Sequence, residues 1–204
     1  MKAFRFVLAG ILLISFSGIL SAQRVSLKAG ALNFLSDQSS VRVEYTYDNM
    51  MVGKYKEADY LAKKTREYNE KEPGKGDQWA QDWVNDRMIR FQPAFEEAYN
   101  TIITIAGVGC KVDPAGSATY RMVVHTTFTE PGFNIYMTRK DASIDAEVIF
   151  YDGANTELAK IFIDNSPGGG IWEMDYDTGV RIKDAYANAG RSLAAFILDK
   201  VHGK

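Results

Sequence analysis

The chain has 204 residues, and its 24 lysine and arginine side chains nearly balance 26 aspartate and glutamate side chains. This balance, without a cluster of basic residues, excludes nucleic acid as a partner, because nucleic-acid binding rewards a concentrated positive patch. The single cysteine, Cys110, excludes an internal disulfide, so the stability of the fold has to come from packing.

Residues 1–22 have the pattern of a secretory signal peptide. Lys2 and Arg5 precede an apolar run over Phe6–Leu20, and the small residues Ser21 and Ala22 follow as a cleavage site. The run is about 15 residues long, shorter than the ~20 that span a membrane as a helix. No cysteine directly follows it for lipid attachment. We therefore expect a periplasmic or secreted mature chain without a transmembrane segment. Removing Lys2 and Arg5 leaves 22 basic against 26 acidic side chains, a formal charge of −4.

Residues 23–204 are expected to form one domain, since about 180 residues suit a single hydrophobic core. Residues 24–35 lack a clean period and predict an irregular lead-in or an edge strand. Residues 39–47 alternate apolar and polar side chains, which predicts a strand. Residues 54–71 carry apolar side chains three and four apart and predict a surface helix.

A second helical segment follows the break at residues 72–76. Asp77 is predicted to cap it, and Trp79 and Trp83 lie on its apolar side. Because proline suits a first helical turn, Pro93 predicts a restart of the helix, which then continues to Ile105. Glycines between residues 107 and 116 predict a loop after it.

Residues 119–164 have the pattern of a four-strand antiparallel meander. The predicted strands cover residues 119–129, 133–138, 144–151 and 158–164, with turns at Pro131-Gly132 and Asp152-Gly153. Period-two alternation assigns one set of side chains to a buried face, which comprises Tyr120, Met122, Val124, Phe128, Phe133, Ile135, Met137, Ile144, Ala146, Val148 and Phe150.

The end of the chain predicts a connector and a long helix. Residues 165–170 are rich in glycine, and an amphipathic pattern follows Gly179 over nearly six turns. The predicted fold class is therefore α+β. It has an antiparallel or mixed sheet, made of one N-terminal strand plus the meander, covered by about three helices including a long C-terminal one.

The sequence offers few groups for catalysis or metal binding. His125 and His202 are the only histidines, and neither has the spacing of a zinc site. Asp175 and Asp177 have the spacing of the first two acidic ligands of a calcium-binding loop, but Tyr186 occupies the position where such a loop requires a later acid. Asp177 or Thr178 is therefore predicted to cap the last helix.

The remaining candidates have structural interpretations. Pro167–Gly170 lacks the lysine of a phosphate-binding loop. Cys110 is predicted to be a small buried side chain and His125 a structural residue in mid-strand. We expect no metal and no cofactor.

The second face of the predicted meander is unusually apolar for a surface in contact with water. Two explanations are open: a helix covers this face, which we favour because three helices need a place, or it is a docking surface. The candidate binding residues on it are His125, Tyr136, Tyr151 and Phe162, accompanied by Val123 and Ile149.

Four segments of the sequence resemble those of a known protein family. They are VRVEYTYDNMMVGKYKEADY, GDQWAQDW, HTTFTEPGFN and IKDAYANAGRSLAAFI. From about Gly30 to its end, the chain resembles an uncharacterised family of small secreted proteins of Bacteroides-type bacteria. The resemblance implies export and no particular activity. By fold analogy alone, the chain also looks like small periplasmic domains that activate or scaffold other envelope proteins.

Three functional hypotheses follow. The first is an exported, non-enzymatic cell-envelope protein that binds or scaffolds a protein partner through a sheet face or edge. The alternative is a periplasmic binder of a small-molecule or lipid-like hydrophobic ligand, held in an aromatic-lined pocket between sheet and helices. The second alternative is a hydrolase that uses scattered acids such as Asp145, Glu147 and Asp164.

Overall fold

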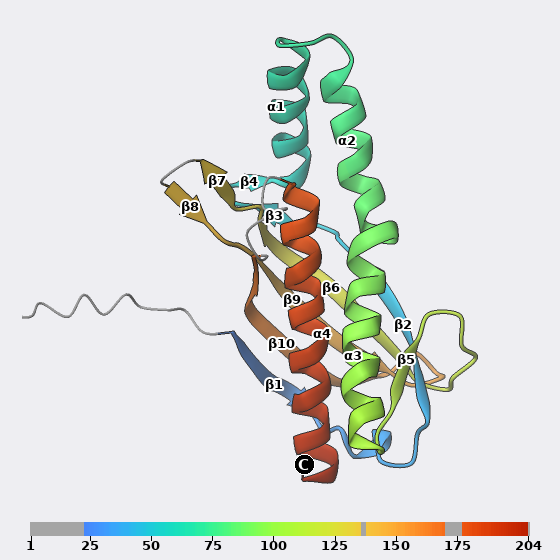
Figure 1. Ribbon diagram of the computed structural model, residues 1–204. Helices are drawn as coiled ribbons and strands as arrows, with labels where there is room; N and C mark the ends of the chain where they lie inside the picture. The colour runs from blue at the N-terminus through green and yellow to red at the C-terminus, as the bar shows by residue number, and fades with distance from the viewer. Residues whose placement is uncertain (1–22, 136–137, 170–176, 204) are drawn as a thin grey trace, which may run out of the picture.

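The computed structural model describes residues 23–135, 138–169 and 177–203 (Figure 1). Within these ranges the chain forms an 8-stranded sheet, a separate two-stranded hairpin and a set of helices. The α+β class expected from the sequence is confirmed.

The main sheet is mixed, with the strand order β1-β10-β9-β6-β2-β5. Neighbours from β1 to β6 are antiparallel, whereas β2 and β5 run parallel to their neighbours. The strands are β1 (Arg24–Gly30), β2 (Ser40–Thr46), β5 (Lys111–Asp113), β6 (Arg121–Glu130), β9 (Ala142–Tyr151) and β10 (Glu157–Gly168). Beyond the end of β2, the short strand β3 (Met51–Val52) pairs with β6 and with β4 (Tyr55–Lys56).

Two long helical segments lie side by side over one face of this sheet (Figure 1). One is α4 (Thr178–His202), and the other is α3 (Gln92–Ala106). A π-helical turn, η2 (Arg87–Phe91), joins α3 to α2 (Lys75–Asp86), which forms a hairpin with α1 (Glu57–Asn69) beyond the end of the sheet. A 3-10 turn, η1 (Asn33–Leu35), follows β1.

Pro93 lies in the first turn of α3, but the predicted restart of the helix is wrong, because the residues on either side of η2 keep right-handed helical backbone angles and the helix continues from α2 into α3. Within the described ranges, no helix combines the length and the hydropathy that a membrane span requires.

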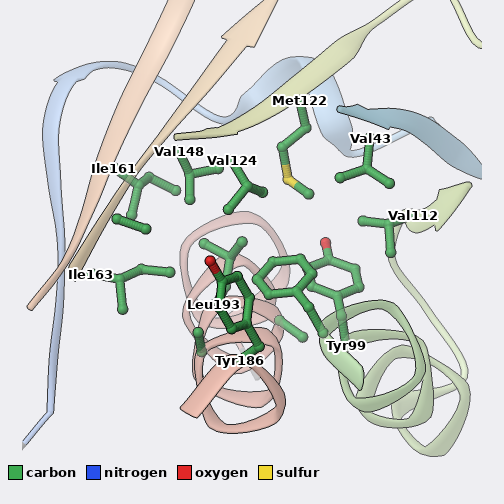
Figure 2. Packing of buried hydrophobic residues seen from close by; sticks show 14 of the residues in the cluster. Val43, Tyr99, Val112, Met122, Val124, Val148, Ile161, Ile163, Tyr186 and Leu193 are labelled. Atoms are coloured by element: carbon green, nitrogen blue, oxygen red, sulfur yellow. The ribbon is translucent and has the colours of Figure 1, made fainter. Parts of the chain in front are cut away.

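The core lies between the sheet and the two helices. Figure 2 shows side chains of the central strands directed at aromatic and aliphatic side chains of α3 and α4. Phe91 stacks on Tyr186 with ring centroids 5.1 Å apart, and the Tyr186 hydroxyl lies 2.6 Å from that of Thr126. Full burial of one such aliphatic or aromatic side chain contributes about 1.5–3 kcal/mol relative to exposure.

Two glycines permit close backbone approach to α4. A Cβ atom at Gly190 would lie 2.3 Å from the carbonyl oxygen of Phe95 in α3. A Cβ atom at Gly168 would lie 2.1 Å from the carbonyl oxygen of Arg181. Only glycine can therefore occupy these positions while α4 keeps its present distance from α3 and β10.

The predicted four-strand meander is wrong in its second strand. Residues 133–138 do not join the main sheet, because β7 (Phe133–Ile135) pairs only with β8 (Thr138–Lys140) in a separate hairpin. Phe133, predicted to be buried, is 38% exposed, and Met137 lies outside the described residues.

A β-bulge overturns the predicted orientation of Phe128. The register between β6 and β9 shifts between Thr126 and Phe128, so that Phe128 pairs with Asp145 on the face away from the helices. Thr129 takes the inward position and is 2% exposed. An extra residue in one strand reverses the alternation after it, which simple period-two counting cannot anticipate.

Other boundaries also differ. The segment 24–30 is an edge strand, one of the two predicted options, and β10 continues to Gly168 through the segment predicted as a connector. Gly74 rather than Asp77 is the N-cap residue of α2. Asp177 caps α4 as predicted, since its carboxylate accepts from the Gly179 amide at 2.8 Å.

Replacing Gly190 by alanine tests the close contact between α3 and α4. The added methyl group overlaps the Phe95 carbonyl, so we expect Gly190→Ala to lower the free energy of unfolding by about 1–3 kcal/mol in chemical denaturation. The matched control is Gly153→Ala, where the nearest atom to the new Cβ is 3.8 Å away. Equal stability of the two variants would contradict the packing described.

Candidate functional site

The two faces of the sheet have different environments. Along β9, fully buried and half-buried side chains alternate over the whole strand. The buried set faces α3 and α4, and none of the helices in the described ranges covers the other face (Figure 1). We call this second face the open face. It carries Glu44, Val123, His125, Glu147, Ile149, Tyr151, Lys160 and Phe162.

The helical cover favoured for this face is therefore wrong. The helices expected to supply it pack elsewhere, because α1 and α2 bury their aromatic side chains against each other. Ring centroids of Tyr60 and Trp83 are 5.3 Å apart, and those of Tyr68 and Trp79 are 5.5 Å apart. These ring contacts pack α1 against α2 without any contact with the open face.

Three of the four predicted binding residues lie on the open face. His125 and Phe162 belong to one cross-strand row, with Glu147 between them. Tyr151 lies four residues from Glu147 along β9, opposite Arg121. Tyr136 lies outside the described residues. The three described residues share a surface but do not converge on one pocket.

Each aromatic side chain of this set has a cation close to its ring. The Arg121 guanidinium lies 4.6 Å from the ring centre of Tyr151, and the Lys28 ammonium lies 5.6 Å from that of Phe162. Such contacts are worth about 0.5–1 kcal/mol at exposed sites. Aromatic and arginine side chains together are the composition that protein interfaces favour.

His125 has a structural partner, as predicted. Its Nδ1 lies 2.8 Å from the Thr46 hydroxyl on the neighbouring strand. Val123 and Ile149 pair directly at the centre of the open face, and Val123 is only 8% exposed. The open face thus has a small apolar centre surrounded by charged residues.

The three acids proposed for a hydrolase each have a structural partner. Glu147 pairs with Lys160 at 3.6 Å, and Asp164 pairs with Arg24 at 2.7 Å. Asp145 accepts from the Asn165 amide at 2.7 Å, and burial raises the pKa of this carboxyl.

A groove of about 460 Å³ between α2 and the start of α4 holds another pair of carboxyls. Burial raises the pKa of Asp86, whereas hydrogen bonds from Arg90 and the Gly179 amide outweigh burial and lower the pKa of Asp177. Arg90 contacts both carboxylates, at 3.0 Å and 2.7 Å. This arginine of η2 joins the last residue of α2 to the N-cap residue of α4, so the pair has a structural role.

A larger groove, of about 660 Å³, lies between the end of β2 and the start of α1. Its lining is mixed: it comprises Tyr45, Thr46, Tyr47, Asp48, Asn49, Met50, Lys56, Glu57, Ala58 and Arg87. The alternation of residues 39–47 predicts a strand that contains Tyr45 and Tyr47, but it does not predict this groove, because residues from four elements form it.

One carboxylate organises the wall of this groove. Glu57 accepts from Trp83 Nε1 at 2.6 Å and also pairs with Arg87. The Arg87 guanidinium lies 4.1 Å from the ring centre of Tyr47. The side chains of Glu57 and Arg87 are 17% and 18% exposed, so water screens their attraction only in part.

The two tyrosines of the groove remain protonated. Burial raises the pKa of Tyr45 and of Tyr47 above the ordinary phenol value. The Tyr45 hydroxyl donates to Glu96 at 3.1 Å. Both side chains are therefore neutral, and each forms hydrogen bonds through its hydroxyl group.

In the part of the chain that the structure describes, no cluster of three or more His, Cys, Asp or Glu side chains could hold a metal ion. Cys110 is buried, as predicted, and burial raises the pKa of its thiol to about 12.

No family model and no curated protein matches the chain. Among solved structures, it is similar to a PelC dodecamer from Paraburkholderia phytofirmans, with a TM-score of 0.38 and 11% sequence identity over 88% of this chain and 98% of that chain. It is also similar to protein XCC0632 from Xanthomonas campestris, of the family model DUF330, with a TM-score of 0.33 and 9% identity over 86% and 93% of the two chains. Similarities this weak carry no inference about function or assembly.

Removing the Glu57 carboxylate tests the cluster in the groove wall. Glu57→Ala leaves Arg87 and the Trp83 indole N–H without their shared acceptor, so we expect a loss of about 1–3 kcal/mol in the free energy of unfolding. The control is Glu67→Ala, which removes an exposed ion pair with Lys63 and should leave stability nearly unchanged. Chemical denaturation measures the free energy of unfolding of both variants. If Glu57→Ala lowers it as little as Glu67→Ala does, Glu57 does not stabilise the groove wall as described.

The carboxyl of Asp145 gives a pH-dependent prediction. Because burial raises its pKa in the folded protein above 3.8, the ionised form costs stability at neutral pH, and this cost disappears as the pH falls through the raised pKa. Asp145→Asn keeps an acceptor for the Asn165 amide and removes the charge. We expect the variant to be more stable than the wild type at neutral pH, with the difference shrinking toward pH 3.8. Denaturation curves across this range would contradict the account if the difference stayed constant.

Proposed function

We propose that this protein is an exported, non-enzymatic component of the cell envelope that binds a partner protein through its open face. The pattern of residues 1–22 and the resemblance to small secreted proteins support the proposed export. The observation that carries the binding role is the absence of any described helix over the open face, although its centre is apolar.

The chemistry of the open face suits a reversible protein contact. Val123 and Ile149 supply an apolar centre, and the ring of Tyr151 next to Arg121 supplies the kind of anchor enriched at interfaces. The surrounding ion pairs keep this surface soluble when no partner is bound. A permanent interface would be more apolar than this one.

The outer edge of β1 is less suited to the same task. Its pairing with β10 is irregular between Leu27 and Ala29, and Lys28 lies in this bulge. A bulge and a lysine are features by which natural sheets prevent edge-to-edge pairing. We therefore place the proposed docking surface on the face rather than on this edge.

A ligand-binding role is the second candidate, and the groove of about 660 Å³ is the observation that favours it. Its volume is within the range of small-molecule sites. Its lining contains a lysine, an arginine and two acids, whereas lipid-like ligands need a mostly apolar pocket. A hydrophobic ligand is therefore the weaker proposal.

Site-specific crosslinking in intact cells tests the proposed function. A photoreactive amino acid at Ile149 on the open face should capture one defined protein, whereas the same group at Arg191, exposed on α4, should not. A second substitution, Val123→Lys, should abolish the capture by placing a charge at the apolar centre. Absence of a crosslink at Ile149, together with a metabolite bound to the purified protein, would overturn the proposal in favour of a ligand binder.

A further inference from the structure

The edge of the sheet beside β2 has a gap. On the side away from β6, β2 pairs with β5 only from Ser40 to Arg42. Farther along the same side, β4 pairs with Met51 and Val52 of β3, and β3 continues the line of β2 along β6. Between these two short strands no described strand lies beside residues 43–47. We call this gap the notch.

Unpaired backbone groups face into the notch. The Arg42 amide donates to the carbonyl of Tyr120, the residue directly before β6, so the amides of Glu44 and Thr46 also point toward β6. The Val43 carbonyl and both backbone groups of Tyr45 point to the opposite side, where the pairing with β5 has ended. None of the described residues forms a hydrogen bond with the amide or the carbonyl of Tyr45. These groups match those that an extended chain presents along its length.

The notch opens into the 660 Å³ groove, whose lining includes Tyr45–Met50 and, across from them, Ala58 and Arg87. From these observations we infer that the notch binds a short extended segment of the partner protein, which adds a strand beside Tyr45 between β5 and β4. This inference rests on the proposed function, since it names part of the partner that the open face would bind. Strand addition of this kind takes its affinity from main-chain hydrogen bonds and its selectivity from alternate side chains.

The walls of the notch restrict what can enter. With β5 at one end and β4 at the other, the free stretch of β2 comprises four residues, 43–46, because the Tyr47 carbonyl already accepts from the Met50 amide in the following turn. At about 3.3 Å per residue it spans roughly 13 Å. A single segment fits this length, whereas the edge of a whole sheet would meet α1 and η2. A second copy of this chain is a poor donor, because its accessible long edge, β1, carries the bulge at Lys28.

The neighbouring side chains indicate the character of the segment. Alternate side chains of an added strand would lie on the helix-covered face, beside the rings of Tyr45 and Tyr47 and the Arg87 guanidinium stacked on Tyr47. The Tyr45 ring is already held through its hydroxyl by Glu96. We expect an aromatic or aliphatic side chain at that position of the segment, since it would be buried against these rings.

A displayed library of short random peptides is the probe for this site. Selected peptides should carry an aromatic or aliphatic residue at one position, and they should protect the Tyr45 amide from hydrogen exchange more than about tenfold. The amides of Glu44 and Thr46 already pair with β6 and should change little. Peptides that bind without protecting the Tyr45 amide, or a library without binders, would overturn the inference.

Two tryptophan variants of α1 complete the test. Ala58 is exposed and lines the groove, so Ala58→Trp should fill the groove and weaken peptide binding more than about tenfold. Ala62, exposed one turn later, does not line the groove, so Ala62→Trp should bind as the wild type does. Equal peptide binding by the wild type and both variants would overturn the inference that the notch binds an extended segment. If the partner nevertheless crosslinks to Ile149, the proposed function survives and only the strand addition fails; loss of the Ile149 crosslink in wild-type protein would count against the proposed function itself.

Discussion

Close backbone packing of α4 is the constraint on which the remaining architecture depends. Gly190 lets α4 approach the Phe95 carbonyl of α3, and Gly168 lets β10 approach the Arg181 carbonyl of α4. Both helices therefore lie on one face of the sheet, where Tyr99, Tyr186 and their neighbours fill the space between the layers (Figure 2). Because the described helices cover only one side of the sheet, no helix within the described ranges shields its second side from solvent or from a partner.

This one-sided arrangement accounts for the charge pattern of the other elements. On the open face, Lys160 with Glu147 and Arg121 with Glu44 surround the apolar pair at the centre. In the groove, by contrast, Glu57 accepts from two donors in a half-buried setting, which joins α1 to α2 and η2. The first set keeps a surface soluble, and the second preserves the shape of the notch. The proposed partner contact uses both, a face for docking and an edge for a strand.

The sequence predicts the elements far better than their arrangement. Period-two and helical spacing locate most strands and all of the long helices, and Asp177 is correctly identified as a cap. The bulge beside Phe128 is missed because it inserts one residue without a glycine or proline to mark it. The helical cover is assigned wrongly because the apolar stripes of α1 and α2 look alike whether they pack on a sheet or, through Trp79 and Tyr68, on each other. The sequence does not predict the groove, because residues that lie far apart in the chain form its lining.

The proposed function requires the open face to be free in the isolated protein and covered by the partner in the cell. Hydroxyl-radical footprinting of the purified protein and of intact cells, compared residue by residue, measures this directly. We expect Ile149, Tyr151 and Phe162 to react readily in the purified protein and to be protected in cells, while Phe196 on α4 reacts equally in both. Equal reactivity of the open face in the two samples would contradict the proposed function.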